Sequence, residues 1–323
     1  EREADKPIRI YIDKYKEVLA SRNGNEHYQK TTLGYISDVL SDAKTSTPKA
    51  IDANTIRLTI TNYRTKGKYN GGRRRKVKPA LETCNHYMRA VKAFSRWLWM
   101  TDILTSDPLK NLSLFNADVD RKKIRRAMSV DELQTLYTYT LSARAYGGKR
   151  WRLTGGDRAL LYVIAASTGL RASELASLKC SAFAFDDGAG ATVKIEAKAS
   201  KNKKFALCPL PQYITKRMKE YLARKKPSDF VWPGTWAKDR QAGVLLKRDA
   251  KGAGITIING EGESIDFHAL RTSFITSLAR NKVHPAIAQR LARHSTINLT
   301  MNTYTKLDDE DLREAVERLP NIQ

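Results

Sequence analysis

The stretch that decides the fold of the first part of this chain is LETCNHYMRAVKAFSRWLWM, residues 81–100. Its apolar side chains recur every three or four positions and form one stripe, made by Cys84, Tyr87, Met88, Val91, Phe94 and Leu98. Because 3.6 residues complete one turn of an α-helix, this spacing predicts a helix over residues 81–100 with one buried face. Shorter runs with the same spacing begin at Pro7, and Asp107-Pro108 ends the helical set. The first part of the chain is therefore predicted to be a helical domain.

The second part is predicted to be mostly helical with a small sheet. A helix is expected to begin at Ser129, because Ser129 and Glu132 have the spacing of an N-terminal capping box. Between residues 191 and 210 apolar and polar side chains alternate as in strands, and residues 201–203 form the turn of a predicted hairpin. Helices are expected again over residues 211–224 and from about Phe267 to the end. The predicted fold class is mainly α, with a small antiparallel β-sheet in the second domain.

The composition of the chain narrows the class of protein. Of its 323 residues 41% are hydrophobic, so ordinary cores can form and about two domains are expected. The longest apolar run, residues 159–166, is far shorter than the ~20 residues that cross a bilayer, and the N-terminus has no apolar signal region. Three widely spaced cysteines argue against a disulfide scaffold or a cysteine zinc site. We expect a cytoplasmic protein with no membrane partner.

The net charge of +24 favours a polyanionic partner, and nucleic acid is the leading one because each neutralised phosphate releases counterions. A basic surface that merely keeps the protein soluble is the alternative. The charge is concentrated in two regions, with a net +10 over residues 51–100 and +9 over residues 201–250, whereas residues 301–323 carry −3. Charge gathered in two separate regions indicates a clamp with a basic face on each domain. The expected organisation is a helical DNA-binding domain over 1–115, a basic linker over 116–127 and a second domain over 128–323.

Three motifs of the second domain contain groups suited to phosphate chemistry. They place Arg171 one helical turn before Glu174, His268 one turn before Arg271, and His294 ten residues before Tyr304. Each motif alone also has a structural explanation, such as a surface ion pair or a buried tyrosine. The signatures GxxxxGK[ST], GxGxxG and HExxH are absent from the sequence, which therefore indicates neither a nucleotide nor a metal cofactor.

Taken in order, these motifs resemble those of the tyrosine recombinases, also called phage-type integrases. The matching segments are residues 84–98, which look like the last main helix of the family's core-binding domain, and Thr-Gly-Leu-Arg171, His268-Ala-Leu-Arg271, His294-Ser and Tyr304. Two positions depart from the family's pattern: Ala292-Arg293-His294 stands where Leu-Gly-His is frequent, and Thr272 stands where histidine is frequent. The resemblance covers nearly the whole chain and implies a SAM-like helical core-binding domain followed by a catalytic domain.

The resemblance also implies a set of catalytic residues and a mechanism without metal, cofactor or ATP. The implied residues are Arg171, Lys201, His268, Arg271, His294 and Tyr304, with Glu174 orienting Arg171 or a neighbouring imidazole. Tyr304 would attack the scissile phosphate, form a 3′-phosphotyrosyl link and free a 5′-hydroxyl, to which Lys201 would give a proton; Lys198 is the alternative donor. The chemistry is consistent, because a planar guanidinium binds two phosphate oxygens at once and a phenol with a pKa of about 10 needs nearby cations or a base to react.

Further residues are expected to contact DNA or a second copy of the chain. The expected phosphate contacts are Arg73, Arg74, Arg75, Lys76, Arg89, Lys92, Arg96, Lys122, Lys123, Lys203 and Lys204. A helix over residues 308–323, with Leu312, Ala315, Val316 and Leu319 on one face, is expected to dock into a neighbouring protomer of a tetramer on duplex DNA; packing onto its own domain is the alternative. The resemblance is compatible with an accessory DNA-bending protein and with association with the nucleoid.

The sequence thus favours a site-specific recombinase or integrase, a DNA strand-transfer enzyme. Two other functions remain as alternatives. A type IB topoisomerase would relax supercoils by the same chemistry, and a non-catalytic protein of the same fold would only bind DNA. The ordered set of arginine, lysine, histidine and tyrosine disfavours the second alternative, because a protein that only binds DNA needs no nucleophile.

Overall fold

The structure is a computed structural model, and it describes residues 3–21, 26–68, 76–120, 124–146, 152–186, 190–197 and 204–304, together with 313, 316 and 317. The chain divides into two compact units, unit 1 (Glu1–Lys122) and unit 2 (Lys123–Gln323). Among the helices of these described ranges, none is both long enough and apolar enough to cross a membrane.

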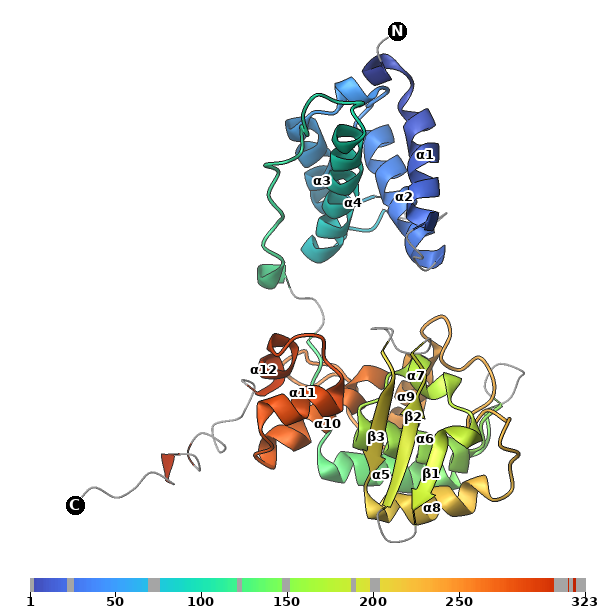
Figure 1. Ribbon diagram of the computed structural model, residues 1–323. Helices are drawn as coiled ribbons and strands as arrows, with labels where there is room; N and C mark the ends of the chain where they lie inside the picture. Colours follow the sequence, from blue (N-terminus) through green and yellow to red (C-terminus); the bar gives the residue numbers. More distant parts are fainter. Residues whose placement is uncertain are drawn as a thin grey trace, which may run out of the picture. The chain divides into compact units, whose positions relative to one another are not determined.

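Unit 1 is a helical bundle in which α4 contacts both α2 and α3 (Figure 1). Its elements are η1 (Glu3–Asp5), α1 (Ile8–Ser21), α2 (Glu26–Asp42), η2 (Pro48–Ala50), α3 (Ala53–Lys66), α4 (Leu81–Met100) and η3 (Ala117–Asp120). The predicted helix over residues 81–100 is confirmed, and its apolar stripe from Cys84 to Leu98 is buried in the core of the unit. The buried side chain of Asn85 joins this core to the segment after α4, since it accepts from the Phe115 amide at 2.8 Å and donates to the Phe115 carbonyl at 2.9 Å.

Unit 2 is also mostly helical and contains a three-stranded antiparallel sheet, which confirms the predicted fold class (Figure 1). Its helices are α5 (Val130–Ser142), α6 (Gly155–Thr168), α7 (Ala172–Ser177), η4 (Cys180–Ala182), α8 (Gln212–Leu222), α9 (Gln241–Gly252), α10 (Phe267–Arg280), α11 (Pro285–Ala292) and α12 (Asn298–Tyr304). The predicted capping box at the start of α5 is present: the Ser129 hydroxyl accepts from the Glu132 amide at 3.1 Å, and the Glu132 carboxylate accepts from the Ser129 amide at 3.0 Å.

The sheet has the order β1 (Phe183–Asp186), β2 (Gly190–Ile195), β3 (Ala206–Leu210). Val193 of β2 lies opposite Phe183 on one side and Cys208 on the other. The predicted hairpin strands are therefore confirmed as β2 and β3, and α6 packs against β3. Strand β1 and helix α9 were not predicted: β1 is too short for its period to show, and α9 contains two glycines, which are weak helix formers.

Helix α6 ends at a glycine that the local packing requires. Gly169 has φ 61° and ψ 21°, the left-handed conformation that commonly ends a helix. A Cβ atom at this position would lie 2.5 Å from the Phe274 ring of α10. The turn after α6 can thus approach α10 closely only because residue 169 has no side chain, and this approach brings the Gly169 carbonyl close to the arginines described below.

A buried ion pair joins α6 to α9. Arg158 and Asp249 are both fully buried, with the Arg158 Nε 2.9 Å from the Asp249 Oδ2 and the Arg158 Nη2 3.1 Å from the Oδ1. The hydroxyls of Tyr146 and Tyr162 each donate to the same carboxylate at 2.6 Å. Asp249 therefore accepts four hydrogen bonds in the core of unit 2, which compensates for the burial of its charge.

Candidate active site

The residues of the three motifs come from four helix ends in unit 2. Arg171 is the N-cap of α7 and follows the Gly169 turn, while His268 and Arg271 lie in the first turn and a half of α10. His294 follows the C-cap of α11, and Tyr304 is the last residue of α12. Helix α10 contacts α6, α11 and α12, so segments more than 100 residues apart in the sequence meet here.

Arg171 is held by the buried carboxylate of Glu174. The Arg171 Nη1 lies 2.9 Å from the Glu174 Oε1, and the Arg171 backbone amide donates to the Oε2 at 2.8 Å. Glu174 has no exposed side-chain surface, whereas the Arg171 side chain is 23% exposed. The structure thus keeps the carboxylate inside the protein and leaves part of the guanidinium exposed. That Glu174 orients Arg171 for catalysis stays a prediction.

Arg271 is buried, with 2% of its surface exposed, and two backbone carbonyls fix its guanidinium. Its Nη1 donates to the Gly169 carbonyl and its Nη2 donates to the Ala292 carbonyl. Burial lowers its pKa to about 9, and the neighbouring charges of Arg171 and Arg293 contribute in the same direction. Arg271 is still a cation at neutral pH, and its buried positive charge near Arg171 is suited to binding an anion.

Both histidines of the motifs are held in the neutral form. Partial burial is the largest cause and lowers the pKa of His268 to about 4, although part of its surface is exposed; Arg125 and Arg271 add to this effect. Burial likewise lowers the pKa of His294 to about 4, with further contributions from Arg271 and Arg171. A phosphate bound beside the arginines would favour the imidazolium form, because an anion stabilises a nearby positive charge.

The ring of His294 is oriented by α12. Its Nδ1 lies 2.9 Å from the Thr300 hydroxyl, and Thr300 is fully buried. Thr300 and Tyr304 are four residues apart on α12 and therefore share one face of the helix. The helix that fixes the imidazole is thus the helix that ends in the predicted nucleophile.

The hydroxyl of Tyr304 makes its hydrogen bond to a backbone carbonyl and not to a residue of the arginine cluster. Its hydroxyl donates to the Val283 carbonyl at 2.8 Å, and burial raises the pKa of the phenol. None of the described arginines lowers that pKa, in contrast to their effect on His268, His294 and Arg271. The structure therefore brings Arg171, His268, Arg271 and His294 close enough together for the arginine charges to lower the pKa of both histidines, and it leaves the Tyr304 hydroxyl on the Val283 carbonyl.

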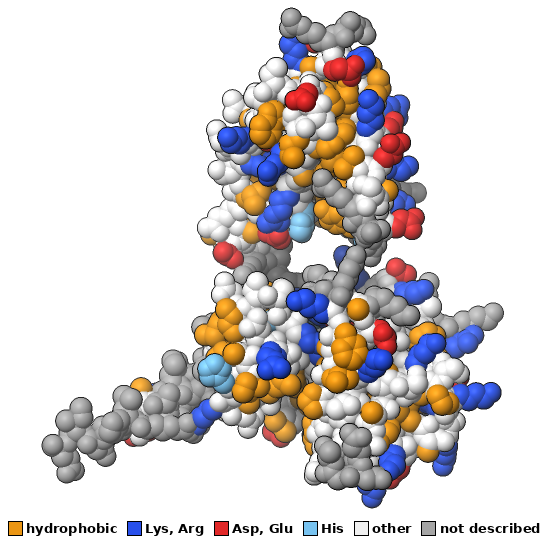
Figure 2. Space-filling model, in the orientation of Figure 1, with side chains coloured by type: hydrophobic (Ala, Val, Ile, Leu, Met, Phe, Trp, Pro, Cys, Tyr) orange, Lys and Arg blue, Asp and Glu red, His pale blue; other side chains and the backbone are white. Residues whose placement is uncertain are grey.

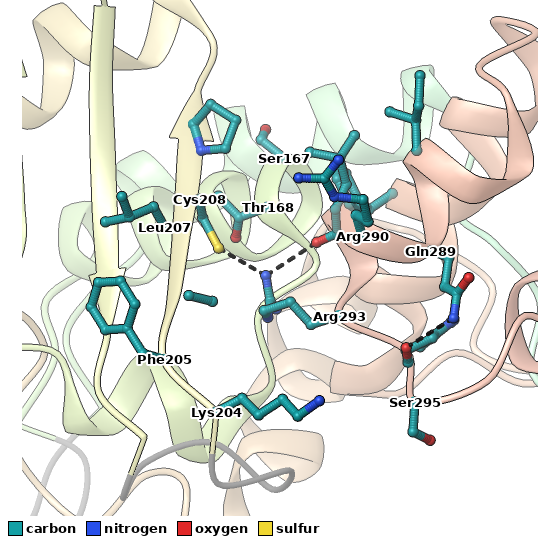
Figure 3. A pocket seen from close by; sticks show the side chains of 16 residues that line it. Ser167, Thr168, Lys204, Phe205, Leu207, Cys208, Gln289, Arg290, Arg293 and Ser295 are labelled. Atoms are coloured by element: carbon teal, nitrogen blue, oxygen red, sulfur yellow. Dashed lines mark hydrogen bonds between the residues drawn. The ribbon is translucent and has the colours of Figure 1, made fainter.

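Arg293 and Cys208 belong to the same cluster, and neither was predicted as a site residue. The Arg293 Nη2 lies 3.3 Å from the Glu174 Oε2, and its Nη1 lies 2.9 Å from the Cys208 sulfur, as Figure 3 shows for the latter contact. Burial raises the pKa of the Cys208 thiol. The only sequence signal was the presence of arginine where the resembled family often has glycine.

A cavity of about 1020 Å³ lies beside this cluster, between β3 and α11. Its lining includes Lys204, Arg290, Arg293 and His294, and Figure 3 shows the Lys204 side chain below Arg293. Lys204 is therefore placed at the predicted hairpin and near the cluster. Lys201, its alternative Lys198, and Lys203 lie outside the described residues.

The predicted DNA contacts of unit 1 differ in their surroundings. Arg89 and Arg96 are exposed on α4, and the Arg89 Nη1 lies 2.8 Å from the Glu82 carboxylate. The Lys92 ammonium donates to the carbonyls of Lys110 and Leu112, so this side chain joins α4 to the segment that follows it. Lys76 is exposed, whereas Arg73, Arg74, Arg75, Lys122 and Lys123 lie outside the described residues. Contact of these side chains with DNA stays a prediction.

The linker expected over residues 116–127 contains the short helix η3 and two arginines that bind within unit 2. The Arg125 Nε contacts both carboxylate oxygens of Asp266, at 3.1 and 2.9 Å. Arg126 contacts Glu132 with two bonds of 2.7 Å. On the face of unit 2 drawn in Figure 2, Lys and Arg side chains are spread widely with fewer Asp and Glu among them.

Comparison with known proteins places this fold and cluster in one family. Residues 126–311 match the model of the phage integrase family. The chain is 28% identical over 166 residues to tyrosine recombinase XerA of Pyrococcus furiosus. The aligned region covers 49% of this chain and 53% of XerA, so the chain spans about half the length of that relative. It is 24% identical over 243 residues to a tyrosine recombinase of Thermosipho africanus, covering 75% of this chain and 77% of the relative.

A solved structure of a lambda integrase tetramer bound to a Holliday junction is similar to this chain. The TM-score is 0.66 at 17% sequence identity, over 95% of this chain and 80% of the other, which establishes a shared fold. The family model covers more than half of the 323 residues. The protein therefore belongs to the phage integrase family.

Proposed function

We propose that this protein is a site-specific DNA recombinase that cuts and rejoins duplex DNA through Tyr304. The observation that carries the proposal is a cluster of three arginines, in which Arg171 and Arg293 contact the carboxylate of Glu174 and the buried Arg271 lies within reach of its charge. Three guanidiniums against one carboxylate leave this cluster of described residues with an excess of positive charge. Such a site suits a phosphodiester, whose transition state develops additional negative charge on its non-bridging oxygens.

In this proposal the Tyr304 oxygen attacks the phosphorus, and the bond to the 5′-oxygen breaks. The phenol passes its proton to one of the two neutral imidazoles, His268 or His294. The leaving oxygen receives a proton from a lysine, which we assign as Lys201, with Lys198 as the alternative. Arg171 and Arg271 bind the non-bridging oxygens, and His268 and His294 donate to them or transfer protons. The 3′-phosphotyrosyl link conserves the energy of the broken bond, so that a second 5′-hydroxyl can rejoin the strand without ATP or metal.

The position of Tyr304 requires one movement before attack. Its hydroxyl must leave the Val283 carbonyl, and α12 must bring the phenol to the phosphate beside the arginines. Because Thr300 of the same helix binds His294, a shift of α12 also changes the surroundings of that imidazole. Binding of the DNA phosphate to the arginine cluster supplies the attraction for this rearrangement.

The test is a trapping experiment on a DNA duplex with a nick close to the cleavage site. Cleavage releases a short fragment that carries the attacking hydroxyl, so the protein stays joined to the DNA and migrates as a covalent adduct on a denaturing gel. Wild type should form the adduct without divalent ions, and Tyr304→Phe should form none. An adduct in Tyr304→Phe, or cleavage only with added divalent ions, would contradict the proposal.

A supercoiled plasmid and a native gel separate this function from the two alternatives. A type IB topoisomerase would relax a supercoiled plasmid that contains no target site, whereas the proposed recombinase acts only where a site is present. A non-catalytic DNA-binding protein would shift the duplex on a native gel and trap no adduct.

The assembly belongs to the proposal as well. We place the two units as a C-shaped clamp on duplex DNA and four protomers on a recombining pair of sites, supported by the fold shared with the tetrameric lambda integrase structure. Docking of residues 308–323 into a neighbouring protomer would hold the tetramer together; most of this segment lies outside the described residues. Deleting residues 308–323 should preserve binding to one site and abolish cooperative assembly on two, and unchanged assembly would refute the docking.

Association with the nucleoid and help from a DNA-bending protein complete the proposal. Recombination by the purified protein on linear DNA should be weak and should rise when a bending protein is added. Full activity without such a protein would remove this part of the proposal and leave the chemistry untouched.

A further inference from the structure

Arg293 occupies a backbone position that disfavours arginine. It is the C-cap of α11, with φ 54° and ψ 43°, the left-handed conformation in which helices commonly end on glycine. A side chain with a Cβ atom is strained in this conformation, and glycine is not. Arginine at this position therefore carries a cost in backbone strain, and the contacts of the Arg293 side chain offset that cost.

The contacts of the Arg293 guanidinium join three segments of unit 2. Its Nη2 donates to the Gly169 carbonyl and to the Glu174 Oε2, both at 3.3 Å. Its Nη1 donates to the Cys208 sulfur at 2.9 Å and to the Leu291 carbonyl at 3.2 Å. The side chain is 10% exposed, and Figure 3 shows it directed from the end of α11 toward Cys208 on β3.

Two of these acceptors are shared with the two arginines that we assign to phosphate binding. The Glu174 carboxylate also accepts from the Arg171 amide and guanidinium. The Gly169 carbonyl also accepts from the Arg271 Nη1. Arg293 therefore contacts one acceptor of each of those two guanidiniums.

We propose that Arg293 is a positioning residue of this active site, which holds the Glu174 carboxylate and the Gly169 carbonyl so that Arg171 and Arg271 stay aimed at the scissile phosphate. The inference rests on the proposed function. In this arrangement Arg293 does not bind the scissile phosphate, because its side chain is only 10% exposed and its guanidinium is directed at acceptors of the protein. It acts through the two other arginines, for which small displacements reduce the rate strongly.

The experiment compares Arg293→Gly with Arg240→Gly. Arg240 is a matched control: it is an exposed arginine in the same unit, it also has a left-handed backbone (φ 63°), and its substitution removes the same charge and relieves the same strain. The measured quantity is the rate of covalent adduct formation on the nicked duplex at saturating protein, with DNA affinity measured in parallel. Arg293→Gly should slow adduct formation by about 30-fold with affinity changed by less than about 3-fold. Arg240→Gly should stay within about 3-fold of wild type in both.

A double-mutant cycle separates positioning from a general loss of structure. If Arg293 acts in part through Glu174, then Arg293→Gly should slow a Glu174→Ala protein by a much smaller factor than it slows wild type. Equal factors in the two backgrounds would overturn the inference. A protein weakened only in its stability would show additive effects and a lower melting temperature.

Arg293→Lys tests the bridging geometry and does not depend on the folding of the glycine variant. Lysine keeps the charge and the aliphatic stem. Its single ammonium group, however, cannot reach both sets of acceptors that the two Nη atoms of the arginine contact. It should be about 10-fold slower than wild type, and full activity would overturn the inference. If wild type itself forms no Tyr304-dependent adduct, the proposed function fails. If wild type forms it and Arg293→Gly is as fast as Arg240→Gly, only this inference fails.

Discussion

Replacing Glu174 by glutamine removes one specific hydrogen bond of the cluster. The carboxylate accepts at Oε1 from the Arg171 Nη1 and at Oε2 from both the Arg171 amide and the Arg293 Nη2. A glutamine has only one acceptor oxygen, and its NH₂ group would face a donor at the other position. Two of the three hydrogen bonds survive if the oxygen occupies the Oε2 position, so the bond from the Arg171 guanidinium is the one that breaks.

The magnitude follows from that single hydrogen bond. A hydrogen bond between charged groups contributes about 1.5–3 kcal/mol. If the Arg171 guanidinium has to be ordered again in the transition state, the rate of adduct formation falls by about 10- to 100-fold, at about 1.36 kcal/mol per factor of ten. Affinity for DNA should change little, because the positive charge of Arg171 remains and only its orientation is affected.

The assay is adduct formation under single-turnover conditions on the nicked duplex, with Glu132→Gln as the matched control. Glu132 is also the third residue of a capping box and also binds an arginine, Arg126, but it lies at the start of α5 and outside the cluster. Glu132→Gln should lower the melting temperature and leave the rate per folded molecule unchanged. The reasoning is refuted if Glu174→Gln reacts within about 3-fold of wild type, or if the control slows as much.

Three further predictions concern stability. Asp249→Asn should destabilise unit 2 by about 3–5 kcal/mol, because it leaves the buried charge of Arg158 without its counter-charge. The melting temperature should fall by about 10 °C, and a fall of less than about 3 °C would contradict this prediction. Gly169→Ala should lower the melting temperature by several degrees and slow adduct formation, because residue 169 has φ 61° and the new Cβ would lie 2.5 Å from the Phe274 ring. An unchanged melting temperature in calorimetry and an unchanged rate in the trapping assay would refute this prediction. Since the folded pKa values of His268 and His294 are about 4, below the usual 6.5, unfolding binds protons between these values, and stability should fall from pH 6.5 toward pH 4. The melting temperature should therefore be lower at about pH 5 than at about pH 7, and replacing both histidines by glutamine should reduce that difference.

Local sequence patterns predicted the secondary-structure elements in which they occur. The period of residues 81–100 predicted α4 and its buried stripe, and the alternation after residue 190 predicted β2 and β3. The spacing of Ser129 and Glu132 predicted the capping box of α5. These features depend on neighbours within a few residues, so the sequence itself contains their signal.

The order of the motifs predicted Arg171, His268, Arg271 and His294 as site residues, and the structure brings these four close together; their catalytic roles stay a prediction. Sequence order did not reveal how they are held. The Gly169 carbonyl that binds Arg271 is 102 residues away, and Glu174 is 119 residues from Arg293. Backbone carbonyls are present at every residue, so nothing in the local sequence marks the ones that will serve as acceptors.

The sequence by itself therefore determined several of the helices, α9 excepted, the two hairpin strands and the set of groups available for phosphate chemistry. Tertiary structure alone decided which of these groups share a buried acceptor, that Arg293 joins them, and that the Tyr304 hydroxyl rests on the Val283 carbonyl. The physical reason is the range of the interactions: hydrophobic period and capping act within one or two turns, whereas buried charges are paired by segments that only folding brings together.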